Sequence, residues 1–309
     1  MNDASSSAGT DPATAPHFLD AEPSTLEEAD AAVLSVPYEG TVSFGTGTAR
    51  GPAAVIGAGP HLETFDEELE WESDGALKVV TLRPIEPARG ERPESFMGRL
   101  KNACMGFGLG PPFPLTFGGE HSITPAVLDG IRDDLSDVTV VQIDAHADLR
   151  DSYHGSRNNH ACAMRRVLDL GVRRLIAVGI RSCTAEEFAM ARDDGRIDTL
   201  YAHQMHDASR WQHLLDDLRA LDGPVYLTVD IDGLDCTLCP GTGTPQPGGL
   251  SWEQALDVVR ATVRESNAEV FGADVVEVAP MGQSQVNEMV AAKLGFKILA
   301  YRFAPGRGR

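Results

Sequence analysis

The sequence contains few cysteines and few basic residues, and it has no long apolar run. Its five cysteines are odd in number and scattered along the chain, which argues against a disulfide framework. With 26 basic against 46 acidic residues and a net charge of −20, it lacks the basic face that a nucleic-acid partner requires. No run of about 18 apolar residues is present, which excludes a membrane-spanning helix. Because no basic segment followed by an apolar stretch opens the chain, we expect no secretory signal and a cytoplasmic protein.

Two of the cysteines, Cys236 and Cys239, have CxxC spacing. As a redox or zinc element, this pair would need a helix N-terminus or a second pair of ligands. A stretch rich in Pro, Gly and Thr follows it instead, and the sequence offers no partner pair. We therefore interpret both as ordinary loop cysteines, with sensitivity to oxidation as a weaker alternative.

The chain does have a hydrophobic content of 42% over 309 residues, which is enough for one large α/β domain. Apolar runs that suit buried strands alternate with amphipathic segments that suit helices, a pattern typical of a parallel sheet covered on both faces. The expected strands are a run ending at Val36 and residues 77–82, 114–117, 138–143, 174–178, 199–202, 225–229, 270–276 and 297–301. The expected helices are one that begins at Pro52 and residues 126–135, 161–170, 185–194, 211–221, 252–265 and 285–294.

Residues 1–29 are rich in Ala, Ser, Thr, Pro and acidic residues, and Arg50 is the first Lys or Arg in the chain. We expect a flexible acidic tail, with order near Phe18 and Leu19 in an oligomer. Residues 30–309 show no shift in composition and no internal repeat, so we expect them to form a single catalytic domain.

Charged residues at the ends of the expected strands are the most informative feature. Residues 138–143 run directly into Asp144, His146 and Asp148. Side chains at i, i+2 and i+4 of an extended segment point the same way. Parallel strands bring their C-terminal ends to one edge of the sheet, where such folds hold their sites. We therefore expect three metal-ligand side chains to converge at this edge.

Three further strands end in residues of the same kind. Asp230 and Asp232 follow residues 225–229, His121 follows residues 114–117, and Glu277 follows residues 270–276. A lone Asp-x-His-x-Asp is often a solvated loop or a helix cap, but burying this many carboxylates without a cation would cost several kcal/mol each. Carboxylates with two imidazoles and no thiolate suit Mn²⁺ better than structural zinc, and the ligand number suits two ions that share Asp144 and Asp230.

Several stretches together resemble the ureohydrolase family, which includes agmatinases and arginases. They are residues 118–124 (GGEHSIT), 144–148 (DAHAD), 230–235 (DIDGLD), 240–250 (PGTGTPQPGGL) and 274–280 (DVVEVAP). Residues 37–41 (PYEGT) and 47–54 (GTARGPAA) are similar to the agmatinase branch. The resemblance covers roughly residues 32–303. It implies an arginase-like α/β fold with three α/β/α layers and a mostly parallel, eight-stranded sheet.

The resemblance also implies two Mn²⁺ ions per subunit, with Ni²⁺ or another divalent ion as an alternative. It assigns His121, Asp144, Asp148 and Asp230 to one ion, and Asp144, His146, Asp230 and Asp232 to the other. Water activated by the ions attacks the guanidinium carbon, and an amine and urea are released. Asp148 is expected to accept a hydrogen bond from the attacking group, and Glu277 is expected to pair with the guanidinium.

Proton transfer needs a histidine beside the ions rather than on them. Two histidines follow Asp148: His160, in a segment that resembles the agmatinase pattern, and His154. We favour His160, with a surface-loop position as the alternative for either residue. The side chains expected at the substrate are Glu277, Asn158, His154 and Thr244. In the family, position 154 is often acidic and position 159 is often serine. His154 and Asn159 therefore depart from the family pattern.

The loop over residues 149–159 differs from the one with which arginases hold the amino-acid end of their substrate, and this favours agmatine, which yields putrescine. Arg150 and Arg157 in this loop would favour a carboxylate, as in 4-guanidinobutyrate, if they point into the pocket. If they point to solvent or pair with Asp151, the cationic substrate agmatine is favoured, and the acidic net charge of the chain weakly supports this choice. Arginine, guanidine and formimidoylglutamate are further alternatives.

Two other classes of protein compete with this interpretation. A deacetylase of related architecture uses a single zinc and would not need Asp230 and Asp232 together with His121. A non-catalytic regulatory homologue would be signalled by a lost metal ligand, and all six positions are filled. We therefore expect a hydrolase with a small guanidino substrate, and the resemblance implies a homotrimer or homohexamer.

Overall fold

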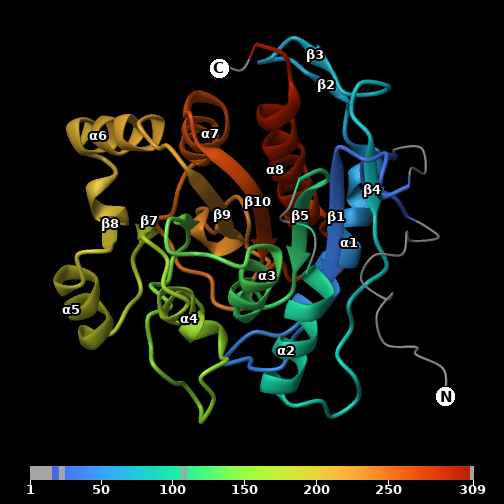
Figure 1. Cartoon of the computed structure of the whole chain (residues 1–309). Helices are drawn as coiled ribbons and strands as arrows, with labels where there is room; N and C mark the ends of the chain where they lie inside the picture. Colours follow the sequence, from blue (N-terminus) through green and yellow to red (C-terminus); the bar gives the residue numbers. More distant parts are fainter. Residues whose placement is uncertain (1–15, 21–24, 106, 108–109, 307–309) are drawn as a thin grey trace.

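A single parallel sheet forms the centre of the molecule (Figure 1). The computed structural model describes residues 16–20, 25–105, 107 and 110–306. Within them the sheet has eight strands in the order β4-β1-β5-β10-β9-β6-β7-β8, and every neighbouring pair is parallel. The strands are β1 (Ala31–Val36), β4 (Val79–Thr81), β5 (Phe113–Gly118), β6 (Thr139–Ile143), β7 (Arg174–Ile180), β8 (Ile197–Tyr201), β9 (Pro224–Asp230) and β10 (Glu269–Val276).

Helices cover both faces of the sheet and make the three α/β/α layers that were predicted. Apolar side chains of α1 (Gly51–Ala58), α6 (Ala208–Arg219), α7 (Trp252–Arg260) and α8 (Val286–Phe303) belong to one core cluster. Those of α2 (Pro93–Cys104), α3 (Thr124–Ile131), α4 (Ala163–Asp169) and α5 (Ala185–Asp193) belong to the other. The arginase-like fold class is therefore confirmed.

Strand β6 shows why these sequences form buried parallel strands. All five of its residues are buried, with Val141 and Ile143 in one core cluster and Val140 in the other. In a strand covered on both faces, side chains of both faces are buried and are therefore mostly apolar. Successive side chains alternate between the two cores. The strand order has a direct consequence for function, because β5, β10, β9 and β6 are consecutive neighbours. Their C-terminal ends therefore meet at the middle of one sheet edge.

One predicted strand is wrong. Residues 297–301 form the later part of helix α8 and not a ninth strand. The apolar run suggested a buried strand, but a helix that is buried on most of its circumference produces the same pattern. Helix α2 and a small hairpin of β2 (Phe65–Asp66) and β3 (Trp71–Glu72) were not predicted at all.

The expected acidic tail falls largely on residues 1–15 and 21–24, which lie outside the described residues, so its extent stays a prediction. Phe18 and Leu19 are among its described residues, and both are buried in the core of the chain itself rather than held only by a neighbouring subunit. The Phe18 ring lies 5.0 Å from the Phe117 ring, and its backbone N–H donates to the Thr81 hydroxyl. Phe18 and Leu19 thus belong to the core.

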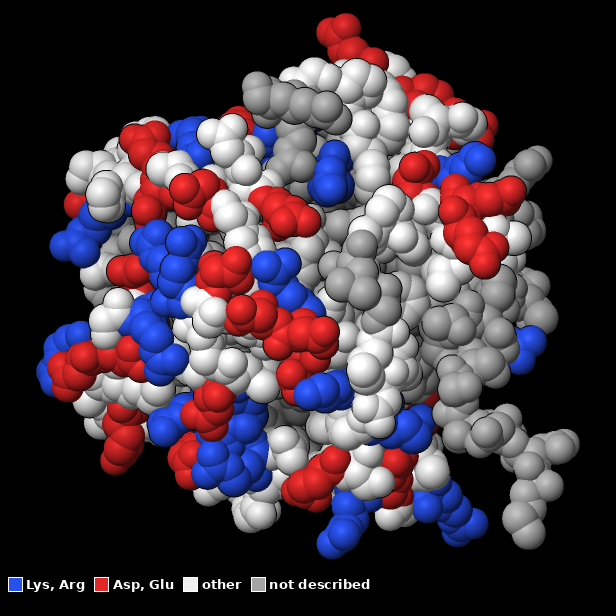
Figure 2. Space-filling view, viewed as in Figure 1, with Lys and Arg blue, Asp and Glu red and all other residues white. Residues whose placement is uncertain are grey.

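Charged side chains of both signs share the surface (Figure 2). On the face shown, blue and red side chains lie side by side. Many arginines of the described chain form ion pairs with carboxylates. Arg166 lies 3.0 Å from Asp151, and Arg157 lies 3.1 Å from Asp169. Among the described residues on this face, no continuous basic area is visible of the kind that a phosphate backbone needs. No helix in the described part of the chain is long and apolar enough to cross a membrane.

A buried ion-pair network fastens the β2–β3 hairpin to α8. The Lys297 ammonium is 2% exposed and lies 2.8 Å from both Asp66 and Glu68. Replacing Lys297 by methionine should lower the free energy of unfolding by about 3–5 kcal/mol, because it leaves the fully buried Asp66 carboxylate without its cation. Urea denaturation followed by circular dichroism measures this change.

Lys293→Met on the same helix is the matched control. Lys293 is only partly buried and lies 4.6 Å from the centre of the Phe296 ring, so its loss should cost less than about 1 kcal/mol. Equal losses in the two variants would contradict a special role for the Lys297 network.

Candidate metal centre

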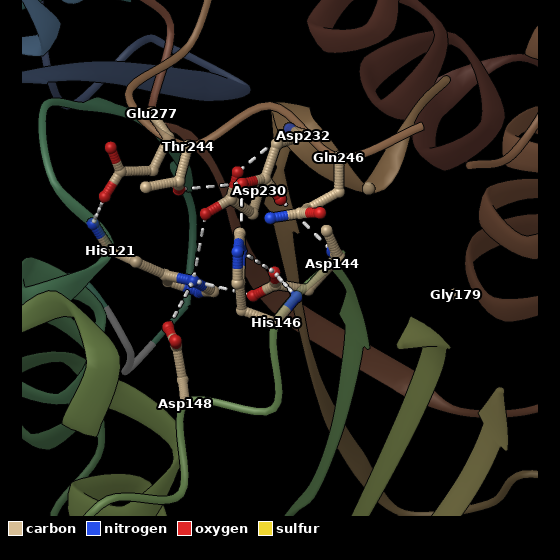
Figure 3. A network of polar contacts seen from close by, with 12 residues as sticks. His121, Asp144, His146, Asp148, Gly179, Asp230, Asp232, Thr244, Gln246 and Glu277 are labelled. Atoms are coloured by element: carbon tan, nitrogen blue, oxygen red, sulfur yellow. Dashed lines mark hydrogen bonds and ion pairs between the residues drawn. The ribbon is translucent and has the colours of Figure 1, made fainter. Parts of the chain in front are cut away.

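Four neighbouring strand ends bring carboxylates and imidazoles together (Figure 3). His121 begins a short helical turn after β5, Asp144 follows β6, Asp230 is the last residue of β9, and Glu277 follows β10. All four are buried. Close packing at the end of β5 is possible because residue 119 is glycine, where a Cβ atom would lie 2.0 Å from the Tyr38 carbonyl oxygen.

The ligand-type atoms form two groups that share Asp144. In the first, His121 Nδ1 lies 3.1 Å from Asp144 Oδ2, 3.2 Å from Asp148 Oδ2 and 3.4 Å from Asp230 Oδ2. In the second, His146 Nδ1 lies 3.0 Å from Asp232 Oδ2 and 3.7 Å from Asp144 Oδ1. Atoms of His121, Asp144 and Asp148, and likewise of Asp144, His146 and Asp232, lie within 4.8 Å of one another. The structure thus brings all six predicted ligands together.

The orientation of His121 depends on residues that sequence reasoning missed. Its Nε2 atom lies 2.9 Å from the Thr228 hydroxyl, and that hydroxyl donates to Asp274 at 2.6 Å. Because a hydroxyl has one hydrogen, Thr228 can only accept from the ring, so Nε2 carries a proton, and in the neutral ring Nδ1 carries the lone pair. Partners of this kind commonly orient metal-binding histidines.

The free lone pair tests whether a cation fits. His121 Nδ1 is buried and has no hydrogen-bond partner among the described residues, although three carboxylate oxygens face it. A lone pair and several carboxylates would repel one another unless a ring proton or a metal ion lay between them. Donor atoms of this type, with no thiolate, suit a hard or intermediate divalent ion. The residues therefore fit a metal.

The acidity of the carboxylates leads to the same conclusion. Burial, with the negative charge of Asp144, raises the pKa of Asp148 to about 7. Burial also raises the pKa of Asp230 well above its usual value, helped by Asp232 and Asp144. Burial and neighbouring carboxylates thus disfavour the ionised forms of Asp148 and Asp230, and divalent cations would offset both effects.

The backbone is strained at three of the predicted site residues: His154, with φ 47°, and two residues of the cluster, Asp148 and Glu277. Asp148 has φ 52° and Glu277 has φ 65°, in the left-handed region that non-glycine residues seldom adopt. Such conformations cost about 1–3 kcal/mol each and persist where the surroundings hold them in place. One such contact is the hydrogen bond from the His121 backbone N–H to Glu277 Oε1, at 2.8 Å.

A cavity of about 220 Å³ opens above this cluster. Among its lining residues are Asp148, Asp230, His146, His160, Thr244 and Glu277, all of them predicted for the site. Thr244 donates to Asp232 Oδ2 at 3.3 Å. Other lining residues were not predicted: Ser43, Tyr153, Ser182, Cys183, Thr184 and Glu187. Arg150 lines the cavity as well, whereas Arg157 pairs with Asp151 and Asp169 at the surface.

The two histidine candidates lie in different surroundings. His160 lines the cavity, and its ring nitrogens lie 3.3 Å from the Thr41 hydroxyl and 3.0 Å from the Ser43 hydroxyl. His154 is exposed, and its ring stacks on Tyr153 with a centroid distance of 4.1 Å. Neither His154 nor Asn158 is among the described residues that line the cavity, so the structure does not bring them to the cluster.

A family model described as the arginase family matches residues 29–300. The chain is 38% identical over 291 residues to an N(1)-aminopropylagmatine ureohydrolase of Synechocystis sp., across 92% of this chain and 93% of that protein. It is 33% identical to an agmatinase of Bacillus anthracis, across 89% of this chain and 92% of that protein. The chain belongs to the arginase family.

Solved structures of arginase-family proteins have the same fold. The agmatine ureohydrolase of Thermoplasma volcanium superposes with a TM-score of 0.78 at 27% identity, over 90% of this chain and 92% of that chain. The arginase of Medicago truncatula gives a TM-score of 0.75 at 25% identity, over 89% and 87%. The predicted ureohydrolase resemblance is confirmed.

Membership of the arginase family establishes the reaction class. The chain is a ureohydrolase, a hydrolase that acts on C–N bonds of amidines. The family uses a binuclear divalent metal site, which agrees with two ligand groups that share one aspartate. The alternatives of a single-zinc deacetylase and a non-catalytic homologue are therefore not supported.

The two CxxC cysteines lie in the turn that follows Asp232 and Asp235. Both are free thiols, and Cys239 is buried. Burial, together with the charge of Glu288, raises the pKa of the Cys239 thiol to about 12. Because zinc binding and disulfide exchange both require a thiolate, this environment favours the interpretation of an ordinary structural cysteine.

Proposed function

We propose that this arginase-family chain hydrolyses agmatine to putrescine and urea with two Mn²⁺ ions. One ion would be held by His121, Asp144, Asp148 and Asp230, and the other by Asp144, His146, Asp230 and Asp232. When bound, such a pair of ions supplies a water-derived nucleophile at neutral pH and stabilises developing charge. The observation that carries the proposal is the pair of ligand groups sharing Asp144 at the floor of a cavity that also contains Glu277.

Glu277 would hold the guanidinium in front of the ions. Its Oε1 atom already accepts the His121 backbone N–H, so Oε2 is free to accept from a guanidinium N–H group. Burial, with the nearby charge of Glu120, raises the pKa of Glu277 well above its usual value. A bound guanidinium would favour the ionised carboxylate again, which makes the site selective for cations. Asp148 would orient the attacking group by accepting a hydrogen bond.

His160 would supply the proton that the departing amine needs. Burial, followed by the charge of His146, lowers the pKa of His160 to about 4. The ring is therefore neutral at neutral pH and takes up a proton only transiently. Once protonated it is a strong acid, so it passes the proton readily to the amine.

One acidic and one basic side chain that line the cavity bear on the choice of substrate. Glu187 is buried, lines the cavity and would attract the ammonium end of agmatine. Arg150 stacks 4.3 Å above the Tyr153 ring, with its Nε atom 3.8 Å from Glu187 Oε2. Arg150 supports a second candidate, a guanidino acid such as 4-guanidinobutyrate, because a carboxylate could pair with it.

Two considerations favour a substrate with an ammonium group over a guanidino acid. Arg150 already has Glu187 and Tyr153 as partners, so a carboxylate would have to compete with them. The relatives reported above are named for agmatine and N(1)-aminopropylagmatine, both of which are amines. We therefore propose an alkylguanidine with a free amine, with agmatine first and its aminopropyl derivative second.

A substrate panel tests the proposal. Urea release with added Mn²⁺ should be fastest for agmatine or N(1)-aminopropylagmatine, and slower for arginine, 4-guanidinobutyrate, 3-guanidinopropionate and guanidine. Glu187→Gln should lower kcat/KM for the amines by about tenfold, which corresponds to the loss of one partly screened charge contact. The same change should leave 4-guanidinobutyrate turnover unaffected, because that substrate has no ammonium group.

Arg150→Gln is the matched variant of opposite sign. It should spare the amines and lower any residual activity towards 4-guanidinobutyrate. A wild-type preference for 4-guanidinobutyrate that disappears in Arg150→Gln would overturn the choice of agmatine and establish the guanidino acid.

Two further expectations are proposed on the basis of the family resemblance. We propose a homotrimer or homohexamer, which light scattering coupled to size-exclusion chromatography would measure. We also propose a cytoplasmic location.

A further inference from the structure

We propose that Glu120 and Thr41 are positioning residues that fix the tautomer of His160 and make its Nε2 atom the site of proton transfer. The proposal rests on the function proposed above, in which His160 moves the proton. Glu120 is adjacent to His121 in sequence, and Thr41 lies in the loop that follows β1. Neither residue was among the predicted site residues.

Glu120 is a buried carboxyl group whose two oxygens accept three hydrogen bonds. Its side chain is 1% exposed. Oε1 accepts the Thr41 backbone N–H at 2.6 Å, and Oε2 accepts the Thr41 hydroxyl at 2.6 Å and the Ser122 hydroxyl at 3.1 Å. Burial raises the pKa of Glu120, whereas the three donors from Thr41 and Ser122 oppose that rise and favour the ionised form, because bonds to a charged acceptor are strong. Glu120 thus holds Thr41 through its backbone and its side chain at once.

The hydroxyl of Thr41 then has no hydrogen left to give. It has one hydrogen, which it donates to Glu120, so its remaining contacts must be donors. Two such contacts come from His160: the backbone N–H at 3.1 Å and ring Nδ1 at 3.3 Å. Nδ1 must therefore carry the ring proton. A carboxylate thus sets a histidine tautomer through an intervening threonine.

The opposite ring nitrogen faces the cavity. With the proton on Nδ1, the lone pair lies on Nε2, which is 3.0 Å from the Ser43 hydroxyl. Ser43 and His160 both line the cavity, so this lone pair is available to a proton from the reaction. The Asn159 side chain also donates to the Thr41 carbonyl oxygen at 3.2 Å, which joins the two loops a second time.

The same construction occurs elsewhere in the site. Asp274 accepts from Thr228, and Thr228 faces Nε2 of His121. In both cases a buried carboxylate binds the hydrogen of a threonine and forces the neighbouring imidazole nitrogen to be a donor. The outcome differs by which nitrogen is held: His121 presents Nδ1 to the ligand cluster, whereas His160 presents Nε2 to the cavity.

The test compares Thr41→Val, which removes the hydroxyl at nearly constant shape, with Thr41→Ser, which restores it. Thr41→Val should lower kcat by roughly 10–100-fold, as loss of a partner that orients a functional side chain commonly does. KM and bound metal should change little, because Thr41 is not in the ligand groups. Thr41→Ser should recover most of kcat. Glu120→Gln should resemble Thr41→Val, because an amide can donate and no longer fixes the direction of the bond.

Thr48→Val is the matched control. Thr48 is a buried threonine nearby in the chain, and its hydroxyl has no hydrogen-bond partner among the described residues. Its replacement should leave kcat near wild type. Thr41→Val should also have no further effect in a His160→Ala background, because a positioning residue acts only through the residue that it positions.

A readout independent of turnover separates this proposal from the proposed function. In the Zn²⁺-loaded protein, NMR of isotope-labelled histidine should show His160 protonated at Nδ1, and Thr41→Val should populate the other tautomer. Protonation at Nε2 in the wild type would overturn the proposal, as would a Thr41→Val variant with unchanged kcat or one that Thr41→Ser fails to rescue. If wild-type protein released no urea from any substrate of the panel, the proposed function would be wrong. The NMR measurement of the His160 tautomer would still test the role of Glu120 and Thr41.

Discussion

Asp144→Ala is expected to abolish urea release and divalent-metal binding together. Asp144 is the one residue present in both ligand groups, with Oδ2 facing His121 and Oδ1 facing His146. Removing it deletes a ligand from each ion and leaves two histidines among fewer carboxylates. Because the ions supply the nucleophile in this family, no slower route through the remaining residues is expected. Metal content by mass spectrometry and urea release at saturating Mn²⁺ measure the two effects.

Asp230→Ala should behave in the same way, since Asp230 is the second residue proposed to serve both ions. Asp198→Ala is a suitable control, because Asp198 is an exposed aspartate on the edge strand β8 and pairs with Arg174. A chelator should abolish wild-type activity, and added Mn²⁺ should restore it. Full turnover in Asp144→Ala, or indifference to the chelator, would contradict a binuclear mechanism.

The ligand cluster was predictable because it depends on local pattern. Asp144, His146 and Asp148 follow a largely apolar strand at spacings of two, and Asp230 and Asp232 repeat this. A parallel sheet places such strand ends at one edge whatever the connections between them. The sheet order was not needed to expect convergence. It explains why the convergence is so close, because the four strands are consecutive neighbours.

Contacts between distant segments could not be predicted in this way. Thr41 and His160 are 119 residues apart, and Lys297 and Asp66 are 231 residues apart. Each of these pairs depends on how two loops or helices pack, and neither loop carries a periodic pattern. Lys297 shows the cost of this limitation: its apolar neighbours suggested a strand, whereas its true partner lies on a hairpin that the sequence did not reveal.

The unusual backbone angles of two site residues could not be predicted from the sequence either. The positive φ of Asp148 and of Glu277 follows from the hydrogen bonds and packing around them, not from their own preferences. The role of Arg150 was open for a similar reason. Sequence reasoning treated Arg150 and Arg157 alike, and only the packing separates the one that lines the cavity from the one at the surface.

His160→Ala is expected to lower kcat by roughly 10²–10⁴-fold, the range typical of a lost general acid or base. Metal content should stay at the wild-type level, because His160 is not in either ligand group. This combination separates a proton-transfer role from a ligand role, since Asp144→Ala should lose both metal and activity. Steady-state urea release together with metal analysis of the purified variant provides the measurement.

His154→Ala is the matched variant for the competing candidate. His154 is exposed, stacks on Tyr153 and does not line the cavity in the described structure, so its removal should change kcat by less than about twofold. If His154→Ala instead lost activity with its metal intact while His160→Ala retained it, the proton path would run through the outer loop. The Glu120–Thr41 pair would then stabilise a loop and would not position the histidine that transfers the proton. The two alanine variants therefore decide whether the histidine next to this pair, His160, is the one that transfers the proton.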